Sequence, residues 1–102
     1  MIYTRGSDGE AALLNIGGEL DAVSVPLLRP TLDELVAERH ERVVVDLAHL
    51  RLIDSSGVGA LVYLFRCVRE HGGKVIVRGA TEQPLAILRL LKLDQILQQE
   101  AA

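Results

Sequence analysis

Short β-branched runs that alternate with helical patterns are the feature of this sequence that most constrains its fold. Residues 42–47 read Arg-Val-Val-Val-Asp-Leu, and residues 74–77 form a second such run. A short run that is apolar at nearly every position is typical of a strand covered on both faces. Strands separated by a helix pair in parallel through right-handed crossovers. The pattern therefore predicts an α/β domain.

Three segments, 27–36, 56–71 and 83–93, repeat apolar residues at helical spacing with charged residues between them. The second is the clearest, because it ends at two glycines and carries one apolar stripe, Leu61, Leu64, Phe65 and Val68. In the first segment, Pro30 lies one turn beyond Pro26 and removes a backbone hydrogen bond. We therefore expect a kink or a late start in that helix.

The beginning of the chain predicts a β-hairpin. Residues 2–4 and 11–16 are apolar, and the segment between them contains Asp8-Gly9, a pair that favours the positive φ angles of a hairpin turn. The hairpin adds an antiparallel strand to the parallel pairs. The predicted fold is a single α/β domain over residues 1–102, with a mixed β-sheet and alternating helices and with no internal repeat or linker.

Composition excludes several classes of function. The net charge is -3 with no cluster of Lys and Arg, and the three aromatic residues are too few to stack unpaired bases, so nucleic acid is not an expected partner. The longest apolar run, 58–65, is much shorter than the roughly 20 residues that span a bilayer, so no membrane insertion is expected. The single cysteine, Cys67, and the absence of a basic and apolar leader indicate a cytoplasmic protein.

The segment Asp54-Ser55-Ser56-Gly57-Val58-Gly59 is the most informative part of the sequence for function. Asp and Ser at the start of a helix are ordinary N-cap residues. A cap needs only one side chain, however, and here two hydroxyls follow an acid. Each of the two glycines also costs a helix about 1 kcal/mol relative to alanine. The excess of small and hydroxyl residues indicates a second role.

A phosphate on Ser55 fits this position physically. It would gain from the free amides and the positive dipole end of the helix. It would also add about -1.5 to -2 of charge beside Asp54. Such a change is tolerable within the fold and hostile to a partner that fits the neutral surface, so the segment predicts a switch.

The same segment, preceded by Asp46-Leu47, resembles the phosphorylation loop of STAS-domain anti-sigma factor antagonists. Gly18-Glu19-Leu20-Asp21 resembles the other hallmark of that family, and the resemblance extends from about residue 11 to residue 97. It implies a STAS-like domain whose helices pack mainly on one face of the sheet.

The resemblance also implies a mechanism. Ser55 would be phosphorylated by an anti-sigma factor that is itself a serine kinase, and ATP would belong to that partner. The unmodified form would bind the anti-sigma factor and release a sigma factor, and a serine phosphatase would reverse the modification. The expected partner-binding residues are the two motifs and one apolar position on the following helix: Glu19, Leu20, Asp21, Asp54, Ser56, Gly57, Val58, Gly59 and Val62. Val62 and Tyr63 fall outside the apolar stripe, and we expect them to be exposed.

The alternatives are weaker. Ser55 and Ser56 lie in neither a Gly-x-Ser-x-Gly nor a Ser-x-x-Lys pattern, so an enzyme is not expected. The histidines and Cys67 lack paired zinc-ligand spacing, and the segment 57–59 is only a fragment of a dinucleotide fingerprint, so neither a metal nor a cofactor is indicated. The remaining rival is a STAS domain that is never phosphorylated and acts as a structural subunit of a transporter or signalling assembly.

Overall fold

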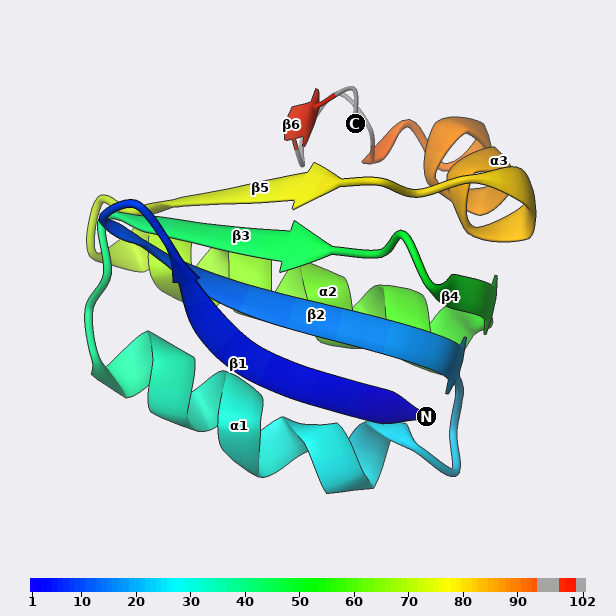
Figure 1. Cartoon of the computed structure of the whole chain (residues 1–102), viewed down its shortest axis with the longest axis horizontal. Coiled ribbons are helices and arrows are strands. Elements are labelled where there is room, and N and C mark those ends of the chain that lie inside the picture. Colours follow the sequence, from blue (N-terminus) through cyan, green and yellow to red (C-terminus); the bar gives the residue numbers. More distant parts are fainter. Residues whose placement is uncertain (94–97, 101–102) are drawn as a thin grey trace.

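The computed structural model describes residues 1–93 and 98–100. The elements follow in the order β1 (Ile2–Asp8), β2 (Ala11–Leu20), α1 (Val25–Ala37), β3 (Arg42–Asp46), β4 (Leu50–Ile53), α2 (Ser55–Glu70), β5 (Lys74–Arg78), α3 (Glu82–Leu90) and β6 (Gln98–Glu100). After the first hairpin, helices alternate with strands, except that β3 and β4 follow each other directly (Figure 1). The predicted α/β class is confirmed.

The strands form one mixed sheet in the order β1-β2-β3-β5-β6, and β4 pairs with β2 outside this path. Only the β1–β2 pair is antiparallel; the others described are parallel. In the hairpin, Asp8 lies opposite Ala11, and Gly9 has a φ of 63°. The predicted hairpin is therefore confirmed, with its turn at Gly9 and Glu10 and with Asp8 as the last residue of β1. Gly9 supplies the left-handed backbone conformation that the two-residue turn requires.

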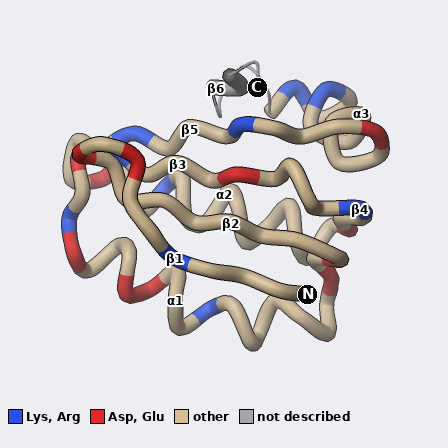
Figure 2. Tube along the Cα trace, viewed as in Figure 1, with Lys and Arg blue, Asp and Glu red and all other residues tan. Residues whose placement is uncertain are grey.

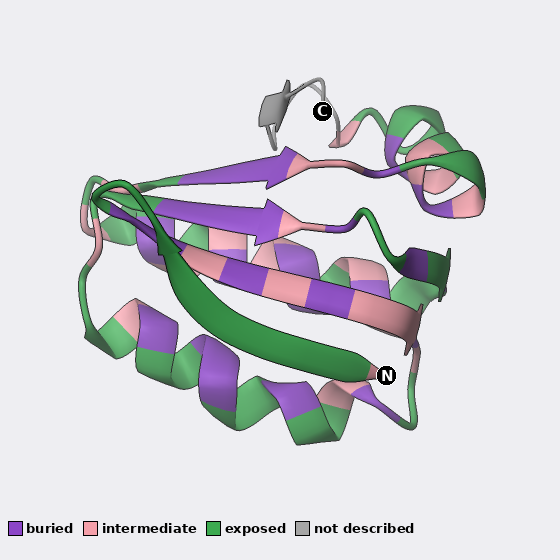
Figure 3. Cartoon of the chain, viewed as in Figure 1, coloured by how far each residue is buried: buried purple, intermediate pink, exposed green. Residues whose placement is uncertain are grey.

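The main core lies between the sheet and the helices. Alternate residues of β2, β3 and β5 point to it, and every helix contributes apolar side chains to the same cluster. The helical members are Leu28, Leu32 and Leu35 of α1, Ala60, Leu61, Leu64 and Val68 of α2, and Leu88 of α3. The expectation that the helices pack mainly on one face is confirmed, and Figure 3 shows the central strands as the buried layer.

The opposite face of the sheet carries a much smaller apolar cluster. Val44 and Ile76 are buried there beside Ala11. On the same face, the Arg78 guanidinium donates to Asp46 Oδ2 at 2.9 Å and to Asp8 Oδ2 at 2.7 Å. This network joins the last residues of β1, β3 and β5, and it accounts for the charged side chains at these strand ends.

Of the two expectations for the first helix, the late start was wrong. Helix α1 begins at Val25 with Pro26 in its first turn and continues through Pro30. Pro30 is exposed and removes only one backbone bond, whereas the buried face of the helix keeps its contacts with the core. In addition, residues 50–53 lie between the predicted strand 42–47 and the predicted helix 56–71, outside every predicted element. They form strand β4 because β2 offers them a parallel partner.

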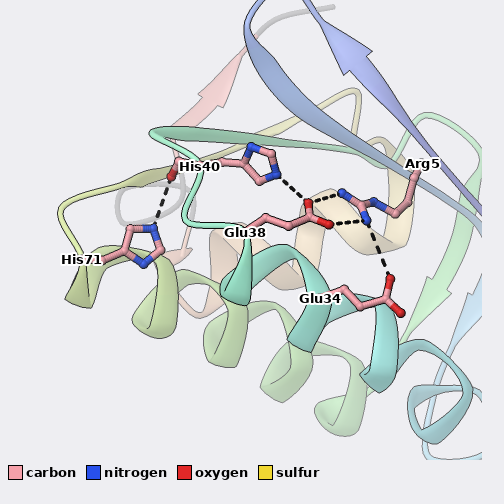
Figure 4. Close-up of polar contacts among 5 residues, drawn as sticks. All are labelled: Arg5, Glu34, Glu38, His40 and His71. Atoms are coloured by element: carbon pink, nitrogen blue, oxygen red, sulfur yellow. Dashed lines mark hydrogen bonds and ion pairs between the residues drawn. The ribbon is translucent and has the colours of Figure 1, made fainter.

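A charged cluster fastens β1 to the end of α1 (Figure 4). The Arg5 guanidinium donates to both Glu38 carboxylate oxygens, at 3.0 and 2.5 Å, and lies 3.7 Å from the Glu34 carboxylate. The His40 ring lies 2.7 Å from the same Glu38 carboxylate, and the His71 ring is hydrogen-bonded to the His40 carbonyl. The hydrogen bonds from Arg5 and then from His40 lower the pKa of Glu38 from 4.5 to about 2.

This depressed pKa predicts how the stability depends on pH. Because the folded pKa is below the unfolded value, the ion pair stabilises the fold above pH 4.5, and the stabilisation is lost as the pH falls towards about 2. Glu38→Gln should therefore lower the free energy of unfolding slightly at pH 6, and the difference from the unmodified protein should shrink between pH 4.5 and 2. Urea titrations at several pH values measure it, with Glu10→Gln, in the exposed turn between β1 and β2, as the control. A difference that stays constant down to pH 2 would contradict the assignment.

Candidate phosphorylation and partner-binding site

The first turn of α2 is capped by Asp54. Its Oδ1 atom accepts a hydrogen bond from the Gly57 N–H at 3.0 Å, and its backbone carbonyl accepts one from the Val58 N–H at 2.9 Å. The helix therefore begins at Ser55, one residue before the predicted start. Of the N-cap candidates in the sequence, Asp54 and the two serines, the structure selects Asp54, whose carboxylate performs that function.

The side chains of the two serines form no hydrogen bonds within residues 1–93. Ser55 is exposed at the first position of α2, and Ser56 is half-buried. Within residues 1–93, neither hydroxyl has a hydrogen-bond partner. Ser55 is therefore exposed, and its hydroxyl holds no contact of the fold within residues 1–93.

The two sequence motifs lie together in space. The Asp54 N–H donates to the Leu20 carbonyl at 3.2 Å, and the second carboxylate oxygen of Asp54 accepts from the Ala22 N–H at 3.3 Å. The contact exists because β2 and β4 run parallel and end together, with Leu20 opposite Ile53. The structure thus places the segment 19–21 beside the Asp54-Ser55 turn.

The turn between β2 and α1 is held by its own side chains. Asp21 Oδ1 accepts from the N–H groups of Val23 and Ser24, at 3.1 and 2.9 Å. The buried Ser24 hydroxyl donates to the Glu19 carbonyl and accepts from the Asp21 N–H. The hydrogen bond from the Ser24 N–H is the main reason that the pKa of Asp21 is lowered. Sequence analysis missed Ser24, although the Asp-x-x-Ser spacing of a side-chain-stabilised turn could have indicated it.

The two glycines of the α2 motif differ in their surroundings. A Cβ atom on Gly57 would lie 2.4 Å from the Leu20 carbonyl oxygen and 2.7 Å from Ile53 Cγ1. A Cβ atom on Gly59 would have no heavy atom within 4 Å. Packing therefore requires glycine at position 57, and it gives no reason for glycine at position 59.

A shallow hollow of about 240 Å³ lies between the two motifs, lined by Glu19, Leu20, Asp21, Leu52, Ile53, Asp54 and Gln83. Sequence analysis missed three exposed apolar side chains on the elements around it. Val23 is 82% exposed, Leu27 66% and Leu52 49%. Leu52 lines the hollow, and Val23 and Leu27 follow the segment 19–21 along the chain. Exposed apolar side chains of this size suit a docking surface.

The second helix is less exposed than expected. Val62 and Tyr63 are both half-buried, and the Arg29 guanidinium lies 3.8 Å above the centre of the Tyr63 ring. Tyr63 therefore packs between α1 and α2. Of the other predicted partner residues on this helix, Val58 is half-buried and Gly59 is exposed.

Charge is distributed over the molecule. Lys and Arg residues are spread over several elements (Figure 2), and Arg51 on β4 lies 3.8 Å from Glu19. In the portion of the chain that the structure describes, no three His, Cys, Asp or Glu side chains gather as a metal site. Among the helices of that portion, none is long and apolar enough to cross a membrane.

Comparisons with known proteins agree on one family. The family model described as STAS domain matches residues 2–101. The anti-sigma-B factor antagonist of Bacillus subtilis (strain 168) is 31% identical over 84 residues, which are 82% of this chain and 76% of that protein. The anti-sigma factor antagonist SpoIIAA in its unphosphorylated form has a TM-score of 0.84 at 18% identity, over 99% of this chain and 88% of its own. The Bacillus cell fate determinant SpoIIAA in its phosphorylated form has a TM-score of 0.79 at 18% identity, over 99% and 91%.

The contrast between the two glycines predicts opposite effects of one substitution. Gly57→Ala should lower the free energy of unfolding by about 1–3 kcal/mol or more, because the new methyl group overlaps the Leu20 carbonyl. Gly59→Ala should raise it by up to about 1 kcal/mol, because alanine favours a helix and has room there. Urea denaturation followed by circular dichroism measures both. Equal effects of the two variants would refute the close approach at Gly57.

Proposed function

This chain belongs to the STAS-domain family, and we propose that it is a cytoplasmic anti-sigma factor antagonist controlled by phosphorylation of Ser55. In its unmodified form it binds an anti-sigma factor that is also a serine kinase, and the sigma factor is released. Phosphorylation of Ser55 ends the complex, and a serine phosphatase restores the active form. The chain acts by binding and is not an enzyme, and the kinase supplies the ATP site.

The observation that carries the proposal is the division of labour between Asp54 and Ser55. Asp54 caps α2 and bonds to Ala22, so both of its carboxylate oxygens are engaged. Ser55, the next residue, is exposed and has no hydrogen-bond partner within residues 1–93. A kinase can therefore phosphorylate this hydroxyl without breaking a contact that the fold needs.

Electrostatics explains why modification would act as a switch. A phosphate brings about -1.5 to -2 of charge to a turn that already holds the Asp54 carboxylate. The free N–H groups and the positive dipole end of α2 offset part of this charge within the domain. No such compensation exists for a partner that fits the unmodified surface, so the penalty falls on the complex.

The proposed partner face combines the two motifs with the apolar residues around them. Glu19 and Asp21 lie beside the Asp54-Ser55 turn at the end of β2. Leu20, which the sequence predicts as a partner-binding residue, is fully buried in the core and is left out of this face. The exposed side chains of Val23, Leu27 and Leu52 would supply apolar contacts that a partner can bury. From α2 we include Ser56, Val58, Gly59 and Val62, with Gly59 leaving the backbone open to close approach. Gly57, which the sequence predicts as a partner-binding residue, is buried against Leu20 and Ile53 and is left out of this face.

Phosphopeptide mapping tests the acceptor. Incubation with ATP and the serine kinase that pairs with this protein should place one phosphate on Ser55. Ser55→Ala should abolish the phosphorylation and Ser56→Ala should retain it, because Ser55 is exposed at the first position of α2 whereas Ser56 is half-buried. Phosphate found only on Ser56, Thr31 or Thr81 would overturn the assignment. No modification by any kinase of the anti-sigma type would favour an unphosphorylated structural subunit.

The two substitutions of Ser55 should separate in binding and not in folding. Since Asp54 provides the cap, both Ser55→Ala and Ser55→Asp should change the free energy of unfolding by no more than about 0.5 kcal/mol. Ser55→Asp adds a negative charge beside Asp54 and should weaken binding to the anti-sigma factor roughly tenfold or more. Ser55→Ala should bind as the unmodified protein does and become insensitive to ATP. Isothermal titration of each variant measures the affinities, and equal affinities would reject the switch.

A further inference from the structure

Strand β4 is completed by a side chain from α3. In the described part of the chain, β4 pairs with β2 alone. The Asp54 N–H points to β2 and bonds to Leu20, so the N–H and the carbonyl of the preceding residue, Ile53, point away from β2. The side-chain amide of Gln83 bonds to both of these groups. Its Oε1 atom accepts from the Ile53 N–H at 2.9 Å, and its Nε2 atom donates to the Ile53 carbonyl at 2.9 Å. One amide group thus replaces the edge of a neighbouring strand.

The backbone before Gln83 is held in an uncommon conformation. Glu82 opens α3 with a φ of 51°, in the left-handed region that residues other than glycine rarely adopt. Thr81 precedes it as the N-cap and makes no capping bond with its side chain. Strain of this kind persists where the surrounding structure requires it. The double hydrogen bond of Gln83 is an observed contact that holds the start of α3 in this place.

We propose that Gln83 is a positioning residue that sets the conformation of the Asp54-Ser55 turn from helix α3. Ile53 directly precedes Asp54, whose carboxylate holds Ala22 and Gly57. The connection therefore runs from Gln83 through Ile53 to the turn that presents Ser55, and Gln83 also lines the hollow between the two motifs. The role in presenting Ser55 rests on the proposed function, whereas the effect on the turn does not.

A purely structural clamp would act differently from a positioning residue. It would add stability to the whole domain and leave the turn unchanged below the melting temperature. A positioning residue changes the turn in the folded protein. The variant Gln83→Met keeps the length of the side chain and removes both hydrogen bonds. Ile87→Val, at a half-buried site on the same helix, removes one methyl group and leaves both hydrogen bonds of Gln83 in place, so it provides a destabilised control.

Amide hydrogen exchange on the free protein, followed by NMR, tests the effect on the turn. Gln83→Met should raise the exchange rate of the Ile53 amide about tenfold or more. It should also raise the rates of the Ala22 and Gly57 amides, which bond to Asp54, relative to the amides of β3 and β5. Ile87→Val should change all protected amides alike or not at all. If Ile53 exchanges faster and Ala22 and Gly57 do not, Gln83 is only a clamp and the proposal is overturned.

Phosphorylation kinetics test the consequence for Ser55. At a temperature well below unfolding, kcat/KM for Ser55 should fall about 2- to 30-fold in Gln83→Met and stay unchanged in Ile87→Val. An unchanged kcat/KM in Gln83→Met would overturn the role in presenting Ser55. If the protein without any substitution is not phosphorylated by the kinase, the proposed function fails. The exchange experiment still decides whether Gln83 sets the conformation of the turn.

Discussion

The close approach of α2 to the end of β2 is the contact on which the rest of the site depends. Only a residue without a side chain fits at position 57, where a Cβ would lie 2.4 Å from the Leu20 carbonyl oxygen. This approach lets Asp54 bond to Leu20 through its backbone and to Ala22 through its carboxylate. Two motifs that are more than 30 residues apart thereby form one surface, and the first exposed residue of that surface on α2 is Ser55.

Much of the fold could be predicted because its strongest patterns are local. The valine-rich strand 42–46, the glycine of the hairpin and the apolar stripe of α2 each carry their own signal. The start of α1 and the strand β4 were not predicted. In both, a contact from another part of the chain decides the outcome: the core offsets Pro30, and β2 pairs with a segment of four residues that contains a charge. Tertiary contacts of this kind leave no periodicity in the sequence.

The site shows the same limit. Ser55 and the two motifs could be predicted from residue types and from the family resemblance. The identity of the cap could not, because Asp54 and both serines satisfy the same preference until the geometry selects one. Ser24 and Gln83 bond to the backbone of Glu19 and Ile53, and any residue type offers a backbone group. The exposure of Val23 and Leu27 could not be predicted either, because the sequence does not distinguish an exposed apolar residue from a buried one within an amphipathic pattern.

The exposed position of strand β1 affects how readily the protein self-associates at high concentration. All its residues are exposed, and it lies at one end of the strand order (Figure 3). A free strand edge is a template for addition of a strand from another molecule, which leads to aggregation. Arg5, in the middle of this strand, is held by Glu38 and would have to lose part of its hydration before a second chain could align there. The ion pair that fastens β1 to α1 therefore also disfavours self-association through this strand edge.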